Sequence, residues 1–122
     1  MPGSHVPQIE TLDGVTVVTF GSEFDQITED RIPGLIESLL AAVDGPRPLL
    51  VVDLSLVQFF GSSFIEVLFR AWKRIQEKPG GRFALCGLTP NCAEVIEVSN
   101  LHKVWDVYPT REAALSAMQS AE

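Results

Sequence analysis

Residues 51–68 read VVDLSLVQFFGSSFIEVL, and this stretch says more about the fold than any other part of the chain. The run 49–54 is apolar apart from Asp53, which predicts a central strand buried on both faces. Asp53 is expected at the end of that strand, bonded to the backbone of the next loop, because an unbonded buried carboxylate is costly. An apolar turn then leads to Gly61-Ser62-Ser63, where we expect a helix to begin. The apolar residues that follow recur at helical spacing and are Phe64, Val67, Leu68, Ala71, Trp72 and Ile75.

The same alternation of strand and helix patterns extends in both directions from this stretch. Strands are predicted at 6–10, 15–20, 82–86 and 104–107, and further helices at 28–43, 91–99 and 110–118. Asp13-Gly14, between the first two strands, is a strong hairpin signal. Strands that alternate with helices form parallel sheets with right-handed crossovers. We therefore expect an α/β fold with a mixed, mostly parallel sheet, an antiparallel edge and helices packed on one side.

The length and charge of the chain restrict its class. The chain has 122 residues, which suits a single domain over 1–122, with residues 1–5 disordered or derived from a tag. Its formal net charge of −7 argues against nucleic acid or an anionic membrane surface and permits a partner with a basic patch. Residues 1–8 do not resemble a signal peptide, and no stretch reaches the roughly 18 apolar residues of a membrane helix. We expect a cytoplasmic protein.

Catalytic and metal-binding patterns are absent from the sequence. There is no Gly-x-Gly-x-x-Gly motif, no P-loop and no Ser-His-Asp or Cys-His set. The two cysteines, Cys86 and Cys92, lie in apolar surroundings without zinc-site spacing, and we expect both to be reduced and packed. The two histidines, His5 and His102, lie in no suggestive context. We therefore expect no metal, no cofactor and no enzymatic activity.

The helix start after the apolar turn is the most chemically informative point of the chain. The first backbone N–H groups of a helix have no partner within it, and the hydroxyl of Ser62 or Ser63 can cap them. A phosphate at this position would also meet the positive end of the helix dipole. Among Phe59, Phe60 and Phe64, we expect two in the core and at least one exposed, as at an interface.

Residues 53–64 resemble the central motif of the STAS family. In that family a hydrophobic strand ends in Asp-Leu-Ser, and an aromatic-apolar pair, Asp-Ser-Ser-Gly and a leucine-rich helix follow. This chain has Asp53-Leu54-Ser55, then Phe59-Phe60, then Gly61-Ser62-Ser63-Phe64. Three further stretches match the family in the same order, at 22–25, 80–85 and 95–101. The resemblance implies a small α/β domain of the bacterial anti-sigma factor antagonist type.

The resemblance also implies a function and a site. In the family, the first Ser of the motif is phosphorylated by a partner kinase that is also an anti-sigma factor, and that residue corresponds to Ser62. The implied partner-binding residues are Asp25, Gly61, Ser62, Ser63 and Phe64. Gly61 and Phe64 stand where the family has Asp and Gly.

Two interpretations of this motif are open. The chain is either a regulator that docks on an anti-sigma factor or switch kinase, or an interaction subunit of a larger assembly. Such an assembly could be a stressosome-like complex or a lipid transporter, and the serine would then be structural. Asp25 is likewise open between a partner contact and a solvated loop carboxylate.

Overall fold

The computed structural model describes residues 7–21, 26–27, 32–44 and 48–119. Within these residues the strands are β1 (Gln8–Leu12), β2 (Val15–Thr19), β3 (Gln26–Ile27), β4 (Leu49–Asp53), β5 (Phe59–Phe60), β6 (Arg82–Cys86) and β7 (Asp106–Tyr108). The helices are α1 (Ile32–Ala42), α2 (Ser62–Gln76), α3 (Pro90–Val98), the short 3-10 helix η3 (Leu101–Lys103) and α4 (Arg111–Gln119).

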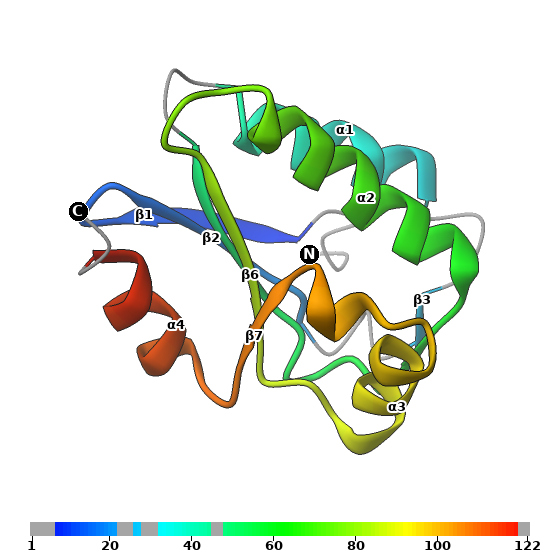
Figure 1. Cartoon of the computed structure of the whole chain (residues 1–122). Helices are drawn as coiled ribbons and strands as arrows, with labels where there is room; N and C mark the ends of the chain where they lie inside the picture. Colours follow the sequence, from blue (N-terminus) through cyan, green and yellow to red (C-terminus); the bar gives the residue numbers. More distant parts are fainter. Residues whose placement is uncertain (1–6, 22–25, 28–31, 45–47, 120–122) are drawn as a thin grey trace, which may run out of the picture.

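Five strands form one sheet in the order β1-β2-β4-β6-β7 (Figure 1). β1 and β2 are antiparallel, whereas β2, β4, β6 and β7 are parallel to one another along the sheet. Between β1 and β2, Asp13 and Gly14 have positive φ angles of 52° and 84°, which a tight two-residue hairpin turn requires. The predicted mixed, mostly parallel sheet is confirmed. β3 and β5 form a separate two-stranded parallel sheet.

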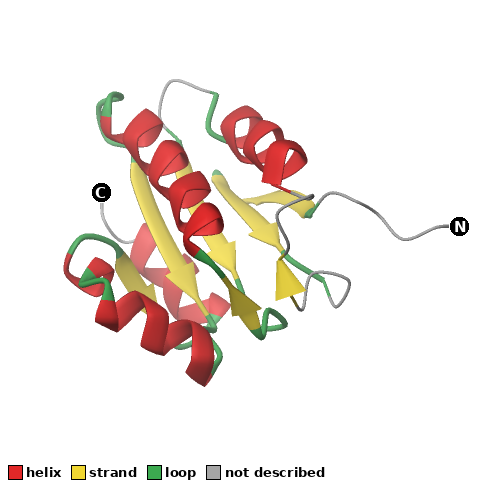
Figure 2. Cartoon of the chain, turned by 90° about the vertical axis from the view of Figure 1, so that its right-hand side faces the viewer, coloured by secondary structure: helices red, strands yellow, loops and turns green. Residues whose placement is uncertain are grey.

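Helices cover both faces of the large sheet, which corrects the expectation that they pack on one side (Figures 1 and 2). α1 and α2 pack over one face, where Leu50 and Val52 of β4 belong to the larger core. α4 packs over the opposite face, where Val51 lies in a second cluster with Ala114 and Met118. Side chains alternate along a strand. Because β4 is apolar on both faces, each face needs a cover.

The element boundaries follow the prediction with few shifts. The first strand begins at Gln8 rather than at residue 6, and the last lies at Asp106–Tyr108 rather than at 104–107. The last strand starts late because Trp105 is only 2% exposed and its N–H still bonds to the Leu101 carbonyl of η3. β3, β5 and η3 are absent from the prediction, since elements of two or three residues show no periodicity. Several predicted features lie outside the described residues: residues 1–5, Val6, the family-like stretch 22–25, the helix start at Thr28 and the helix end at Gly45-Pro46.

Asp53 ends β4 at the carboxyl edge of the sheet and is only 6% exposed. Its Oδ1 accepts hydrogen bonds from the backbone N–H and the hydroxyl of Ser55, at 3.0 and 2.7 Å. Its Oδ2 accepts a bond from Nε of Arg111 at 3.2 Å, and Nη2 of the same guanidinium donates to Thr19 Oγ1 at 2.7 Å. Arg111 also pairs with Glu10 at 3.4 Å. The predicted strand-end position of Asp53 is confirmed, and its carboxylate links β1, β2, β4 and α4 through Arg111.

Replacing Arg111 by Met is expected to lower the free energy of unfolding by about 2–3 kcal/mol, because the Asp53 carboxylate would stay buried without its cation. Arg82→Met is the matched control: Arg82 pairs with the exposed Asp106 at 3.5 Å and donates to the Ala117 carbonyl at 3.3 Å, and neither loss leaves a buried charge unpaired. Losing such an exposed pair costs about 1 kcal/mol or less. Urea unfolding followed by circular dichroism measures both variants. Equal losses would show that the Asp53–Arg111 pair contributes no more than a surface contact.

Candidate functional site

The loop from Leu54 to Gly61 joins β4 to α2 and is fixed at several points. Leu54 N donates to the Cys86 carbonyl at 3.1 Å, and Val57 N donates to the Leu54 carbonyl at 3.0 Å. The Val57 carbonyl accepts a hydrogen bond from Thr89 Oγ1 at 2.8 Å. Thr89 is the N-cap residue of α3, but its hydroxyl binds this loop and does not cap the helix. The side chains of Leu54 and Val57 are fully buried. These contacts fix the point at which α2 begins.

Two of the three phenylalanines around this loop are buried and one is exposed, as the sequence predicts. Phe64 packs edge-on against Phe20, with ring centroids 5.5 Å apart, and against Phe60 at 5.1 Å. Phe59 is 55% exposed and Leu56 is 49% exposed. The outer surface of the loop therefore presents two large apolar side chains to solvent, a feature typical of interfaces.

Gly61 is the N-cap residue of α2, and Ser62 is the first residue of the helix. The Gly61 carbonyl accepts the N–H groups of Phe64 and Ile65 at 3.2 and 3.3 Å. None of the described side chains caps this helix start. The expectation that Ser62 or Ser63 is the N-cap is therefore wrong, because the chain enters the helix one residue earlier, at a residue without a side chain. Ser62 is exposed and Ser63 is half-buried.

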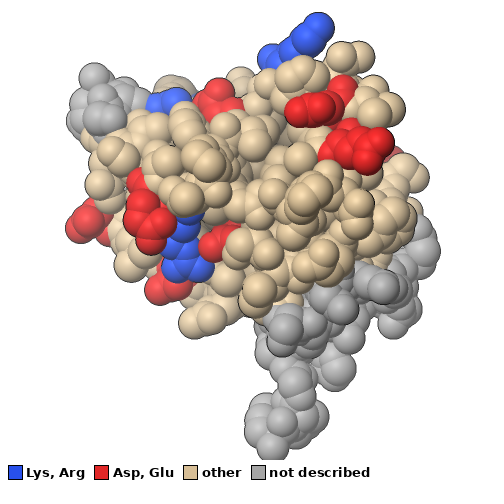
Figure 3. Space-filling model, turned by 90° about the horizontal axis from the view of Figure 1, so that it is seen from below, with Lys and Arg blue, Asp and Glu red and all other residues tan. Residues whose placement is uncertain are grey.

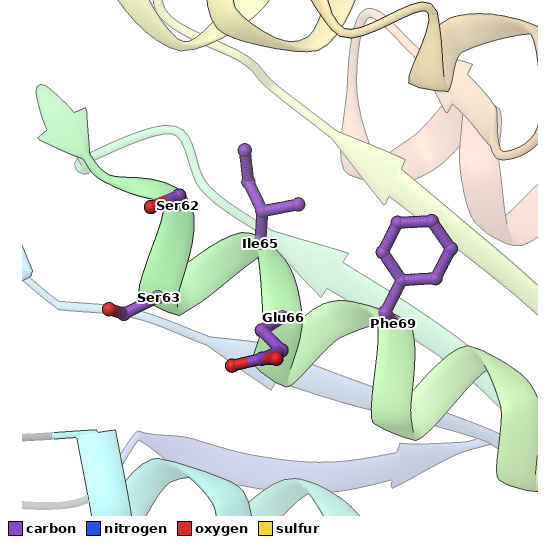
Figure 4. Close-up of a pocket in the computed structure, with 5 residues that line it drawn as sticks. All are labelled: Ser62, Ser63, Ile65, Glu66 and Phe69. Atoms are coloured by element: carbon purple, nitrogen blue, oxygen red, sulfur yellow. The ribbon is translucent and has the colours of Figure 1, made fainter.

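A shallow depression of about 280 Å³ lies beside the first two turns of α2. The residues that line it are Ser62, Ser63, Ile65, Glu66 and Phe69. Figure 4 shows Ile65 and Phe69 projecting from the same side of the helix, with Ser62 at its start. The Phe69 ring continues inward to Trp105, with centroids 5.2 Å apart. The depression thus combines a hydroxyl at its rim with an apolar wall.

The structure brings together part of the predicted partner-binding set. Gly61, Ser62 and Ser63 are adjacent at the start of α2. Phe64 is 1% exposed and lies in the core, so its prediction as a partner contact is corrected. Asp25 lies outside the described residues. The surface residues that the sequence analysis missed are Leu56, Ile65, Glu66 and Phe69, which only the turn geometry and the orientation of α2 reveal.

The described part of the chain around Ser62 carries little charge. Residues 54–63 contain no Asp, Glu, Lys or Arg, and Glu66 supplies the charge in the lining of the depression. Figure 3 views the molecule from below Figure 1, and among the described residues it shows a broad area without charged side chains between a mixed group of red and blue side chains on the left and acidic side chains at the upper right. A charge added at Ser62 would therefore change the character of this surface.

Both cysteine thiols are free and buried, as predicted. Burial, and then the Asp53 carboxylate, raise the pKa of the Cys86 thiol to about 12. Burial also raises the pKa of Cys92. Both thiols therefore stay protonated at neutral pH and pack as small hydrophobes.

In the part of the chain that the structure describes, no three His, Cys, Asp or Glu side chains come together in a way that could hold a metal ion. None of the helices among those residues is long and apolar enough to cross a membrane.

The STAS domain model matches residues 6–114, and the chain therefore belongs to the STAS domain family. Curated relatives carry the name of anti-sigma factor antagonists. The anti-sigma F factor antagonist of Paenibacillus polymyxa is 26% identical over 112 residues, which are 92% of this chain and 93% of that protein. The anti-sigma-F factor antagonist RsfB of Mycobacterium tuberculosis is 27% identical over 118 residues, 97% of this chain and 93% of that protein.

Solved structures agree with this family and with the observed fold. An anti-sigma-factor antagonist (STAS) domain protein from Planctomyces limnophilus is 41% identical, with a TM-score of 0.89, over 93% of this chain and 98% of that chain. An anti-sigma factor antagonist from Mycobacterium paratuberculosis is 30% identical, with a TM-score of 0.79, over 94% of each chain. A stressosome chain at 20% identity and a TM-score of 0.63, covering 92% of this chain and 96% of that one, shares the fold alone.

Replacing Gly61 by Asp is expected to stabilise the domain by about 0.5–1 kcal/mol. A β-carbon at Gly61 would meet no atom within 4 Å, and its φ of −106° suits any residue. The new carboxylate would cap the free N–H groups of α2 and complement the positive end of the helix. Thermal unfolding measures the change.

Gly87→Ala is the contrasting control for this prediction. Gly87 has a φ of +70°, and its β-carbon would lie 2.9 Å from Ser55 Cβ, so we expect a loss of about 2 kcal/mol or more. A destabilised Gly61→Asp variant would show that the helix start lacks the open space described above.

Proposed function

We propose that this domain is an anti-sigma factor antagonist, a regulatory module without catalytic activity that binds an anti-sigma factor or switch kinase in the cytoplasm. The names of the relatives at 26 and 27% identity support this role. The structural relative at 41% identity has the same description. The chain spans nearly the full length of each of these proteins, so the similarity extends over the whole of each relative and not over a shared fragment.

The proposed docking surface is the outer face of the loop after β4 together with the first turns of α2. It contains the exposed side chains of Leu56 and Phe59, the Ser62 hydroxyl and the depression beside Phe69. Exposed apolar groups on a loop that is held by hydrogen bonds and by buried side chains favour association, because little conformational entropy is lost on binding. Asp25, which lies outside the described residues, is retained as a proposed contact.

We further propose that phosphorylation of Ser62 releases the partner. The observation that carries this proposal is that Ser62 is exposed at the first residue of α2 and ends the uncharged stretch 54–63. A phosphoserine adds about −1.5 to −2 charge at neutral pH. The N-terminus of α2 accommodates that charge within the domain. A partner shaped for a neutral hydroxyl would instead bury an unpaired charge, which is costly.

The two departures from the family motif leave the Ser62 hydroxyl accessible. Phe64 replaces the family's Gly, but its ring packs inward against Phe20 and Phe60 and adds no bulk beside the hydroxyl. Gly61 replaces the family's Asp and leaves open space where that side chain would lie. What the chain loses at Gly61 is a carboxylate beside the phosphate acceptor, so we expect kinase recognition to depend on other contacts.

Ser62→Ala is expected to bind the cognate anti-sigma kinase as wild type does, whereas Ser62→Asp should bind at least about tenfold more weakly, a change of about 1.4 kcal/mol. Thermal stability should stay nearly unchanged in both, because a carboxylate in the first turn suits the helix dipole. Isothermal titration calorimetry with the kinase recovered in a pull-down measures the affinities, and mass spectrometry after incubation with ATP locates the phosphate.

Thr11→Asp is the matched control, since Thr11 is exposed on β1, in a different element from the proposed docking surface. Its affinity should equal that of wild type. Equal affinities for wild type, Ser62→Ala and Ser62→Asp would reduce Ser62 to an ordinary helix residue. That outcome would favour the alternative role of an interaction subunit in a larger assembly.

Purified protein is expected to show no catalytic turnover with nucleotides or esters. The reason is that both thiols are protonated and buried and that Ser62 has no histidine near it in the sequence. Product release assays with ATP, GTP and a chromogenic ester measure this. Activity that disappears on a single substitution, such as Ser62→Ala, would contradict the regulatory proposal.

A further inference from the structure

The groove between α1 and α2 concentrates positive charge on an acidic domain. The lining residues are Leu40 of α1, Arg70, Lys73 and Arg74 of α2, and Glu77 just beyond it, around a volume of about 260 Å³. The three cations stand at positions i, i+3 and i+4 and so share one face of the helix. All three are exposed. The whole chain has 16 acidic and 9 basic residues, whereas basic residues outnumber acidic ones in the lining of this groove.

These cations have no partner in the part of the chain that the structure describes. The basic residues that do pair with a described carboxylate are Lys78, Arg82 and Arg111. Arg70, Lys73 and Arg74 form no ion pair or hydrogen bond with those residues through their side chains. The lining of the groove thus sets three uncompensated cations against the one carboxylate of Glu77.

Helix-end electrostatics account for only two of these three cations. Basic residues in the last turn of a helix complement its negative end, and Lys73 and Arg74 lie in that turn. Arg70, however, lies more than a turn before the helix end, where the effect of the dipole has faded. The cations therefore present most of their bonding capacity to solvent.

We propose that this groove binds a short acidic segment of a protein partner, with carboxylates against the three cations and an apolar side chain against Leu40. The net charge of −7 favours this occupant. A nucleic acid or an anionic bilayer would extend over the whole negative surface and be repelled, whereas a short peptide meets only the groove, within a Debye length of about 8 Å. At a rise of 1.5 Å per residue, Arg74 lies about 18 Å along α2 from Ser62. The groove therefore extends away from Ser62, and only its Arg70 end adjoins the depression, at Phe69.

The test uses a short labelled peptide in which glutamates alternate with leucines, and a second peptide with glutamine in place of glutamate. Fluorescence polarisation should show that wild type binds the acidic peptide at low salt and loses it at high salt. Lys73→Gln should weaken binding about two- to fivefold, and the triple variant Arg70→Gln/Lys73→Gln/Arg74→Gln at least about tenfold. Lys103→Gln, which removes an exposed cation on η3, and Ser62→Asp should both bind as wild type does.

Several outcomes would overturn the proposal. If the wild-type protein does not bind the acidic peptide, or binds the glutamine peptide with equal affinity, the groove is not a site for acidic segments. A triple variant with unchanged affinity places the binding elsewhere. Binding to phosphatidylserine vesicles that the triple variant loses, without peptide binding, would assign the groove to a membrane. Self-association that the triple variant loses would assign it to a second copy of the chain. Circular dichroism confirms that each variant is folded, and the exposure of all three side chains makes misfolding unexpected.

Discussion

The pairing of the Asp53 carboxylate with Arg111 is the interaction on which the arrangement of this domain depends. β4 is buried on both faces, and its last residue, Asp53, carries a buried carboxylate. Desolvating that charge is costly, and the cost is offset by two bonds from Ser55 and one from the guanidinium. Because Arg111 also reaches Thr19 and Glu10, the same ion pair ties α4 to three strands. The bonds to Ser55 set the direction in which the chain leaves the sheet.

That direction determines the geometry of the candidate site. The chain leaves Asp53, buries Leu54 and Val57 against the core, and begins α2 at Gly61. Close packing leaves the loop little freedom: Gly87 has a φ of +70° and approaches Ser55 so closely that no larger residue fits. A surface held in this way loses little conformational entropy when a partner docks on it. The stability of the core and the definition of the proposed docking surface therefore have the same physical origin.

The sequence predicts the elements of this fold better than it predicts their placement. Apolar periodicity locates the main strands and helices, because burial in a strand and burial in a helix leave different spacings. It does not reveal that α4 crosses to the second face, since the alternation of Leu50, Val51 and Val52 shows only that both faces of β4 are apolar. It also misses the partner of Asp53, which lies 58 residues away in Arg111. The site is predicted in part for the same reason: Ser62 follows from the motif, whereas the inward turn of Phe64 depends on the space that Phe20 and Phe60 leave.

The aromatic packing behind the depression has an optical consequence. Phe69 lines the depression and contacts both tryptophans of the chain, Trp72 at 5.7 Å and Trp105 at 5.2 Å between ring centroids. The Trp105 indole is 2% exposed, and its Nε1 has no hydrogen-bond partner among the described residues. An indole in such apolar surroundings emits at shorter wavelength than one in water. Any rearrangement of Phe69 alters the surroundings of both fluorophores, so the native emission spectrum of the domain is an intrinsic, label-free reporter of events at the start of α2.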